Sequence, residues 1–116
     1  MRRGEVWKAH FKTSAGIRPV VILTRDDVIP YVNKVTVAEI TSQGKGYRTE
    51  VEIGYRANLP QHSFVQLDNL QTIPKTWLEK HFGTLDDEIM KVIGQKVVLA
   101  LNLEDAYPFP VFPAPS

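Results

Sequence analysis

Cysteine is absent from this sequence of 116 residues. Without thiols the chain can form neither a disulfide nor a cysteine-ligated zinc site, and it has no cysteine nucleophile. No stretch approaches the roughly 18 consecutive apolar residues of a membrane-spanning helix. The first residues, MRRGE, lead directly into a strand-like pattern without the apolar core of a signal peptide. We therefore expect a cytoplasmic protein that does not associate with membranes.

The signatures of several common enzyme classes are missing as well. The sequence contains no GxxxxGK(S/T) phosphate-binding loop, no HExxH zinc motif and no GxSxG nucleophile motif. Its three histidines, His10, His62 and His81, lie too far apart for the usual spacing of metal ligands. The acidic pairs at 26–27 and 86–87 suit a turn and a helix start. We therefore expect no metal ion and no other cofactor.

Charge is divided unevenly along the chain. Residues 1–56 contain ten Lys or Arg against six Asp or Glu, whereas residues 57–116 contain four against seven. A basic half on a chain of net charge +1 can provide a surface that attracts phosphate groups. Chance clustering of solvated surface charge explains the division about equally well, so charge alone does not assign a nucleic-acid partner.

Short segments with the patterns of β-strands occupy most of the chain up to Leu85. In 5–11, Trp7, Ala9 and Phe11 alternate with polar residues, which is the period of a half-buried strand. The run VVIL is apolar throughout, as in a strand buried on both faces. Counting these two, at 5–11 and 18–23, strands are predicted also at 34–40, 49–53, 63–67 and 82–85, with the fifth ending at Asp68-Asn69.

One helix is predicted near the end of the sequence. Asp86 suits an N-cap, and Asp87 and Glu88 place negative charge in the first turn, where the helix dipole favours it. Apolar residues at helical spacing then form one stripe: Ile89, Met90, Ile93, Val97, Ala100 and Leu101. Five or six strands and one late helix indicate a mainly β, α+β fold. We expect a small, strongly bent antiparallel sheet that forms a partial barrel, with the helix over one open end.

The domain is expected to span residues 1–103. Residues 104–116 contain four of the eight prolines, and a proline-rich segment of this kind is typical of an extended or disordered tail. Its three aromatic residues, Tyr107, Phe109 and Phe112, leave open that the tail packs on the body of the protein or on a partner.

Cationic and hydroxyl side chains at predicted strand ends are the strongest candidates for chemistry. Arg18 stands where the loop KTSAG enters the second strand, so its guanidinium can meet a scissile phosphate, on which negative charge grows in the transition state. Thr41 ends the third strand and can donate a hydrogen bond to a phosphate oxygen. Asp68 follows the fifth strand, with Gln66 two residues earlier on the same face. Spacing alone leaves simpler roles open: a surface salt bridge for Arg18 and a turn for Thr41.

The order and spacing of several segments resemble the MazF/PemK family of toxin–antitoxin endoribonucleases over about residues 2–103. The matching segments are RRGEVW (2–7), RPVVIL (18–23), IT (40–41), TEVEI (49–53), SFVQLDNLQTI (63–73) and LDDEIMKVIGQKVVLAL (85–101). The resemblance implies a homodimer of SH3-like barrels and a cognate antitoxin that neutralises it. It also implies cleavage of single-stranded RNA without a metal ion. The ribose 2′-hydroxyl is then the nucleophile, and the products carry 2′,3′-cyclic phosphate and 5′-hydroxyl ends.

The resemblance also indicates site residues. Arg18 and Thr41 fall on the family's catalytic arginine and threonine, and Asp68 falls on an acidic position that some members use as the base. We expect further RNA contacts from the loop before Arg18, from the segment after the second strand and from the fifth strand. The candidates are Lys12, Thr13, Ser14, Arg25, Gln66 and Gln71.

Departures from the family pattern leave the acid–base assignment and the preferred RNA sequence open. His62 stands where many members have aspartate, Gln71 where they have arginine, and Gln66 where some have a basic residue.

Two other functions remain: a toxin of the same barrel fold that inhibits DNA gyrase by protein contact, and a non-enzymatic SH3-like binding module. The helix of this chain ends in LALNLED, whereas gyrase-inhibiting toxins end in a tryptophan-glycine-isoleucine tip.

Overall fold

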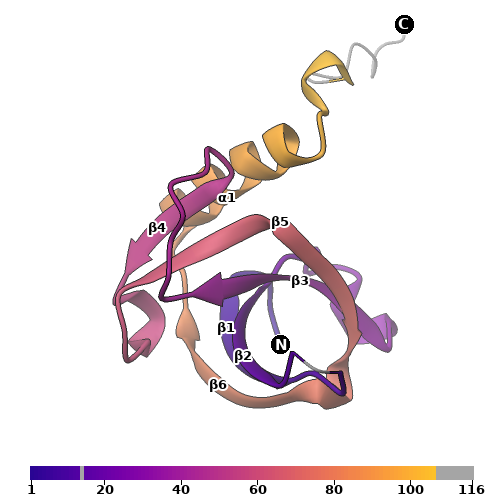
Figure 1. The fold of residues 1–116 in the computed structure, drawn as a ribbon. Helices are drawn as coiled ribbons and strands as arrows, with labels where there is room; N and C mark the ends of the chain where they lie inside the picture. The colour runs from indigo at the N-terminus through magenta and orange to yellow at the C-terminus, as the bar shows by residue number, and fades with distance from the viewer. Residues whose placement is uncertain (14, 107–116) are drawn as a thin grey trace, which may run out of the picture.

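The computed structural model describes residues 1–13 and 15–106. They form strands β1 (Glu5–His10), β2 (Ile17–Ile22), β3 (Lys34–Thr41), β4 (Glu50–Gly54), β5 (Ser63–Pro74) and β6 (Leu78–Thr84), and helix α1 (Asp87–Ala100). Short 3-10 turns are η1 (Ile29–Tyr31), η2 (Arg56–Asn58), η3 (Lys75–Trp77) and η4 (Glu104–Ala106). The strands make one antiparallel sheet, ordered β4-β5-β3-β2-β1-β6, which curls into a partial barrel (Figure 1). The expected mainly β fold with a C-terminal helix is confirmed.

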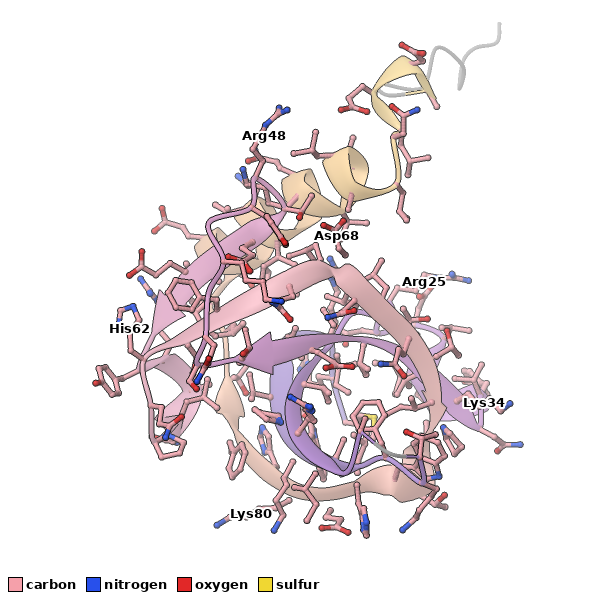
Figure 2. All side chains as sticks on the ribbon, viewed as in Figure 1. Arg25, Lys34, Arg48, His62, Asp68 and Lys80 are labelled. Carbon is pink, nitrogen blue, oxygen red and sulfur yellow. The ribbon has the colours of Figure 1, made fainter. Side chains whose placement is uncertain are left out.

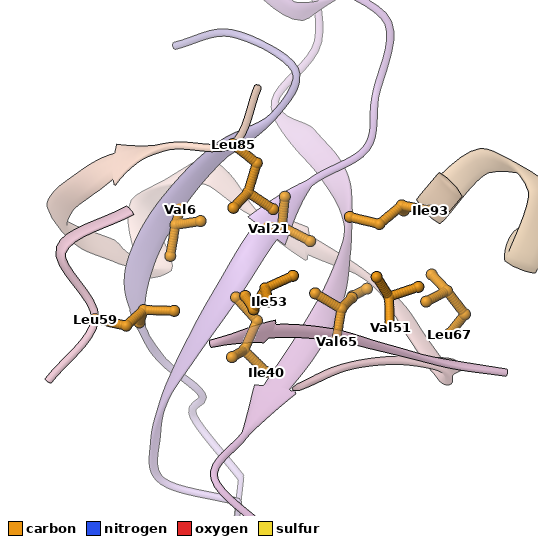
Figure 3. Close-up of a cluster of buried hydrophobic side chains, with 11 residues drawn as sticks. Val6, Val21, Ile40, Val51, Ile53, Leu59, Val65, Leu67, Leu85 and Ile93 are labelled. Carbon is orange, nitrogen blue, oxygen red and sulfur yellow. The ribbon is translucent and has the colours of Figure 1, made fainter. Parts of the chain in front are cut away.

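Both faces of the central strands are buried. In β2, Val20 and Ile22 point to one face and Val21 to the other, and all three are fully buried. Val21 belongs to a helix-side cluster that also contains Ile93 of α1 (Figure 3). Val20 and Ile22 belong to a second cluster on the opposite face, together with Ala9, Phe11, Ile29, Val35, Val37 and Ile73. The continuous apolar run in the sequence therefore correctly predicted a strand buried on both sides.

Strand β5 is much longer than the sequence pattern suggested. The prediction that it ends at Asp68-Asn69 is wrong, because the strand continues to Pro74. Its pairing with β3 shifts at this point: Glu39 lies opposite Gln66, whereas Ala38 lies opposite Leu70. Residues 67–69 therefore form a bulge, which absorbs the turn-favouring Asp-Asn pair and allows the strand to bend around the barrel (Figure 1).

The two edge strands of the sheet, β4 and β6, are joined by packing. The amide of Asn58 in η2 donates a hydrogen bond of 2.8 Å to the carbonyl oxygen of Phe82 in β6. The neighbouring Ala57 lies so close to β6 that a Cβ atom added at Gly83 would be 2.8 Å from the Cα of Ala57. Turn η2 thus closes the side of the barrel that no strand ladder closes.

Helix α1 begins and packs largely as predicted. The carboxylate of Asp86 accepts a 2.9 Å hydrogen bond from the backbone N–H of Ile89, which confirms the N-cap. Ile93 is fully buried, and Ile89, Met90, Val97 and Ala100 pack against the helix-side cluster. Leu101 is an exception to the predicted stripe: it is the C-cap residue and is 52% exposed. Within the described residues, no helix is long and apolar enough to cross a membrane.

The structure describes only the first three residues, 104–106, of the predicted C-terminal tail. Glu104–Ala106 forms the short turn η4 beyond the helix. The aromatic and proline residues of the expected tail, from Tyr107 onward, lie outside the described residues.

Candidate functional site

A groove of about 960 Å³ is lined by residues of strands β2, β3, β4 and β5. Its walls also come from the loop after β3 and from the segment before β5. We define the groove by its charged and polar residues: Lys8, Arg18, Glu39, Thr41, Ser42, Gln43, Lys45, Thr49, Glu50, Gln61, Ser63, Gln66, Asp68 and Asn69. Three residues that the sequence singled out as catalytic, Arg18, Thr41 and Asp68, therefore share one cavity.

Arg18 and Thr41 stand at corresponding places on β2 and β3. The antiparallel ladder between these strands ends at the pair Val20–Glu39, and each of the two residues lies two positions beyond it on its own strand. Their side chains therefore project from the same face of the sheet, and both line the groove. The sequence alone does not show that these two residues lie near each other, because they are far apart along the chain and only the pairing of β2 with β3 brings them together.

The side chains of Arg18 and Thr41 are available to a ligand. Arg18 is exposed, and its Nε donates to the carbonyl oxygen of Ala15 at 3.3 Å. Among residues 1–13 and 15–106 it forms no ion pair. The hydroxyl oxygen of Thr41 accepts a hydrogen bond of 3.0 Å from the backbone N–H of Gln43, so its own proton can be donated into the groove.

Glu50 organises the loop that forms one wall of the groove. Its carboxylate accepts hydrogen bonds from the backbone N–H of Lys45 at 3.0 and 3.1 Å and of Gly46 at 3.0 Å, and from Nε2 of Gln66 at 3.1 Å. Desolvation raises the pKa of Glu50, but the hydrogen bonds from Gln66 and from the backbone of Lys45, Gly46 and Tyr47 outweigh it and hold the pKa below its ordinary value.

The sequence analysis missed Glu50 and Glu39. Glu50 follows the glycine-bearing loop GKGYRT, a setting in which a carboxylate often caps backbone N–H groups. Glu39 is the one acidic residue of the strand KVTVAEI and stands on the same face as Val35 and Val37, and this irregularity was the available signal. In the structure Glu39 is half-buried in the groove, and its Oε2 accepts a hydrogen bond from Nε2 of Gln71.

Asp68 lies at the bulge of β5 and lines the groove. Its Oδ2 accepts a 2.6 Å hydrogen bond from the hydroxyl of Thr49. The side chain is exposed (Figure 2). The neighbouring Asn69 donates to Oε1 of Gln66 at 3.1 Å. Asp68 and Gln66 thus belong to a hydrogen-bonded polar row along the outer part of the groove.

The other residues predicted to bind RNA take different positions. Gln66 lines the groove, whereas Gln71 does not and instead donates a hydrogen bond to the carboxylate of Glu39. Lys12 and Thr13 are exposed in the β1–β2 loop, and Ser14 lies outside the described residues. Arg25 is exposed, pairs with Asp27 at 3.1 Å and is not among the groove residues (Figure 2).

Two lysines that the sequence analysis did not single out add positive charge to the groove. Lys8 and Lys45 both line it, and Nζ of Lys8 lies 3.9 Å from a carboxylate oxygen of Glu79. Together with Arg18, they give the groove three cationic side chains, which offset the carboxylates of Glu39, Glu50 and Asp68. Each cation is a possible contact for a phosphate group. In the part of the chain that the structure describes, no group of three or more His, Asp or Glu residues could hold a metal ion.

Comparison with known proteins identifies the class to which this fold and groove belong. The model of the PemK-like, MazF-like toxins of type II toxin–antitoxin systems matches residues 2–101. Endoribonuclease MazF3 of Mycobacterium tuberculosis is 47% identical over 87 residues, which cover 75% of this chain and 84% of that protein. The chain belongs to the PemK/MazF toxin family.

Solved structures agree with this membership. The Mycobacterium tuberculosis toxin MazF-mt6 superposes with a TM-score of 0.78 and 35% sequence identity, covering 84% of this chain and 96% of that one. An endoribonuclease from a mycobacterial species, solved in complex with its cognate antitoxin, has a TM-score of 0.79 at 23% identity, covering 89% and 96%. The latter likeness shows the fold.

Proposed function

We propose that this chain is an endoribonuclease toxin that cuts single-stranded RNA without a metal ion. The observation that carries the proposal is that Arg18 of β2 and Thr41 of β3 line one polar groove, in a chain 47% identical over 87 residues to an endoribonuclease. The products would end in a 2′,3′-cyclic phosphate and a 5′-hydroxyl, because the nucleophile is the 2′-hydroxyl of the RNA itself.

Arg18 and Thr41 would hold the scissile phosphate. As the 2′-oxygen attacks phosphorus, negative charge grows on the non-bridging oxygens, and a guanidinium stabilises this charge more strongly than that of the ground state. The hydroxyl of Thr41 would donate to one of the same oxygens and orient the phosphate. A carboxylate in the groove would accept the proton of the 2′-hydroxyl. The family resemblance assigns that role to Asp68.

Binding of the rest of the RNA would use the remaining polar groups of the groove. Gln66 is suited to contact a base edge, since its amide offers both a donor and an acceptor. Lys8 and Lys45 would attract backbone phosphates. Lys12, Thr13, Arg25 and Gln71 do not line the groove, and we propose that they contact a longer RNA or support the site. Ser14 also stays a proposed RNA contact.

The chain would work as a homodimer in the cytoplasm and be neutralised by a cognate antitoxin. Membership of a type II toxin family supports the antitoxin, and a related fold has been solved with one bound. Residues 1–103 would form the catalytic domain. Residues 104–116 would form a separate tail.

An RNA cleavage assay in EDTA tests this proposal. The purified protein should cut a single-stranded transcript, and the new 5′ ends should accept phosphate from polynucleotide kinase without prior dephosphorylation. Arg18→Ala, an exposed substitution that should leave the fold intact, should cut slower by on the order of 100-fold. Cleavage that requires added magnesium or manganese would contradict the mechanism. Inhibition of DNA gyrase supercoiling with no RNA cleavage would identify the gyrase-directed alternative.

A further inference from the structure

Glu39 lies near Arg18 and Thr41, the residues proposed to bind the scissile phosphate. It precedes Thr41 by two residues in β3, so the two side chains project from the same face with Cα atoms about 6.6 Å apart. Its cross-strand neighbours are Val20 of β2 and Gln66 of β5. Arg18 precedes Val20 by two residues on β2, so Glu39 and the arginine are diagonal neighbours across the β2–β3 pair.

The carboxylate of Glu39 is oriented by a hydrogen bond and forms no ion pair among the described residues. Its Oε2 accepts a hydrogen bond from the amide of Gln71, which lies on the same face one step deeper in the sheet. Within residues 1–13 and 15–106 it forms no ion pair with a lysine or arginine. Among the described residues Oε1 of Glu39 forms no hydrogen bond, and it is not fully buried, because no buried side-chain oxygen there lacks a partner. Glu39 itself lines the groove. One oxygen is thus held in place and the other can accept a proton.

Asp68 is in a less suitable position for the same proton. Thr41 pairs with Phe64 of β5, and Asp68 lies four residues further along that strand, within the bulge and beyond Gln66, the partner of Glu39. The side chain of Asp68 is exposed, whereas that of Glu39 is half-buried beside Thr41. The 2′-hydroxyl is adjacent to the scissile phosphate, so its base must lie close to the groups that bind that phosphate.

We propose that Glu39 is the general base of the cleavage reaction and that Gln71 positions it. The Oε1 atom of Glu39 takes the proton of the 2′-hydroxyl while the 2′-oxygen forms a bond to phosphorus. The bond from phosphorus to the 5′-oxygen breaks, and the leaving oxygen takes a proton from water. This closes the cyclic phosphate and leaves the 5′-hydroxyl, with no oxidant or metal required. The inference rests on the proposed function, and it goes beyond it by replacing Asp68 with Glu39.

The variant Glu39→Gln tests the assignment, because glutamine keeps the size of the side chain and its contact with Gln71 but cannot accept the proton. We expect kcat to fall by about 100-fold or more, the contribution typical of a general base, with KM changed by less than about threefold. The acidic limb of the pH–rate profile seen in the parent should disappear. The matched control is Glu52→Gln on β4, a carboxylate that pairs with His62 outside the groove and should leave cleavage unchanged.

A second variant covers the case in which Glu39→Gln does not fold. Glu39→Ala removes the carboxylate, and added formate should restore cleavage by at least about tenfold by taking the place of the missing base. A merely structural role of Glu39 would give no such rescue. Failure of formate to act on a folded Glu39→Ala protein contradicts the proposal.

The outcomes separate this inference from the proposed function. A parent protein that does not cut RNA refutes both. A parent that cuts RNA, together with Glu39→Gln at the parental rate, refutes the role of Glu39 alone. If Asp68→Asn instead loses cleavage and its acidic pH limb, the base is Asp68.

Discussion

Gly83 is the position at which a single methyl group should weaken the barrel most clearly. A Cβ at Gly83 would lie 2.8 Å from Cα, and 2.9 Å from both the carbonyl carbon and oxygen, of Ala57. Carbon atoms in contact prefer roughly 3.5–4.0 Å, so η2 would have to retreat by about 1 Å. The obstacle is backbone, which cannot turn away as a side chain can.

The expected cost of Gly83→Ala follows from this clash. Overpacking of a well-packed site costs about 1–3 kcal/mol. Retreat of η2 also strains the hydrogen bond from Asn58 to Phe82 that closes the barrel. At about 4–8 °C per kcal/mol for a domain near this size, the melting temperature should fall by roughly 4–20 °C. Thermal unfolding followed by circular dichroism measures this shift.

Gly94 provides the matched control. It lies inside α1, and a Cβ added there would meet no atom within 4 Å. Gly94→Ala should therefore raise the free energy of unfolding by up to about 1 kcal/mol, since alanine is the better helix former. A Gly83→Ala protein that melts at or above the parental temperature would refute the reasoning about barrel closure.

Three further predictions concern the loop, the tail and the assembly. Because the pKa of Glu50 is lowered in the folded protein, its stabilising contacts are present above its ordinary value near 4.5 and are lost as the pH falls through the folded pKa. The melting temperature of the parent should therefore drop more steeply on acidification than that of Glu50→Gln, and parallel curves would contradict this. A chain truncated after Glu104 should still cut RNA; a truncated protein that folds and dimerises but does not cut would place the tail in the site. Light scattering at micromolar concentration should give twice the 13.2 kDa of one chain, and a mass of 13.2 kDa throughout would exclude the dimer.

Local sequence patterns were sufficient where one element determines its own structure. The apolar run of β2 predicted burial on both faces, and Asp86 predicted the start of α1 because an N-cap depends on residues only three positions away. The pattern failed at Asp68-Asn69. Turn propensity there is real, but pairing with β3 resumes at Leu70 and continues to Pro74, so the strand passes through a bulge instead of ending.

The residues of the site could be named from the sequence, but their arrangement could not. Strand pattern and family resemblance were enough to select Arg18, Thr41 and Asp68. Only the pairing of β2 with β3 brought Arg18 into one groove with Thr41 and Glu39, and only the register shift of β5 placed Asp68 at a bulge.

Composition, strand period and helix capping are local properties, so the sequence by itself determined the class of fold, the family and the candidate residues. The closing of the barrel by η2 against Gly83, the hold of Glu50 on the loop, and the hold of Gln71 on Glu39 were decided by the tertiary structure. Each of these three contacts joins residues whose distance in space depends on strand register. A shift of one residue would turn every side chain of a strand to the opposite face, and local propensity does not encode that choice.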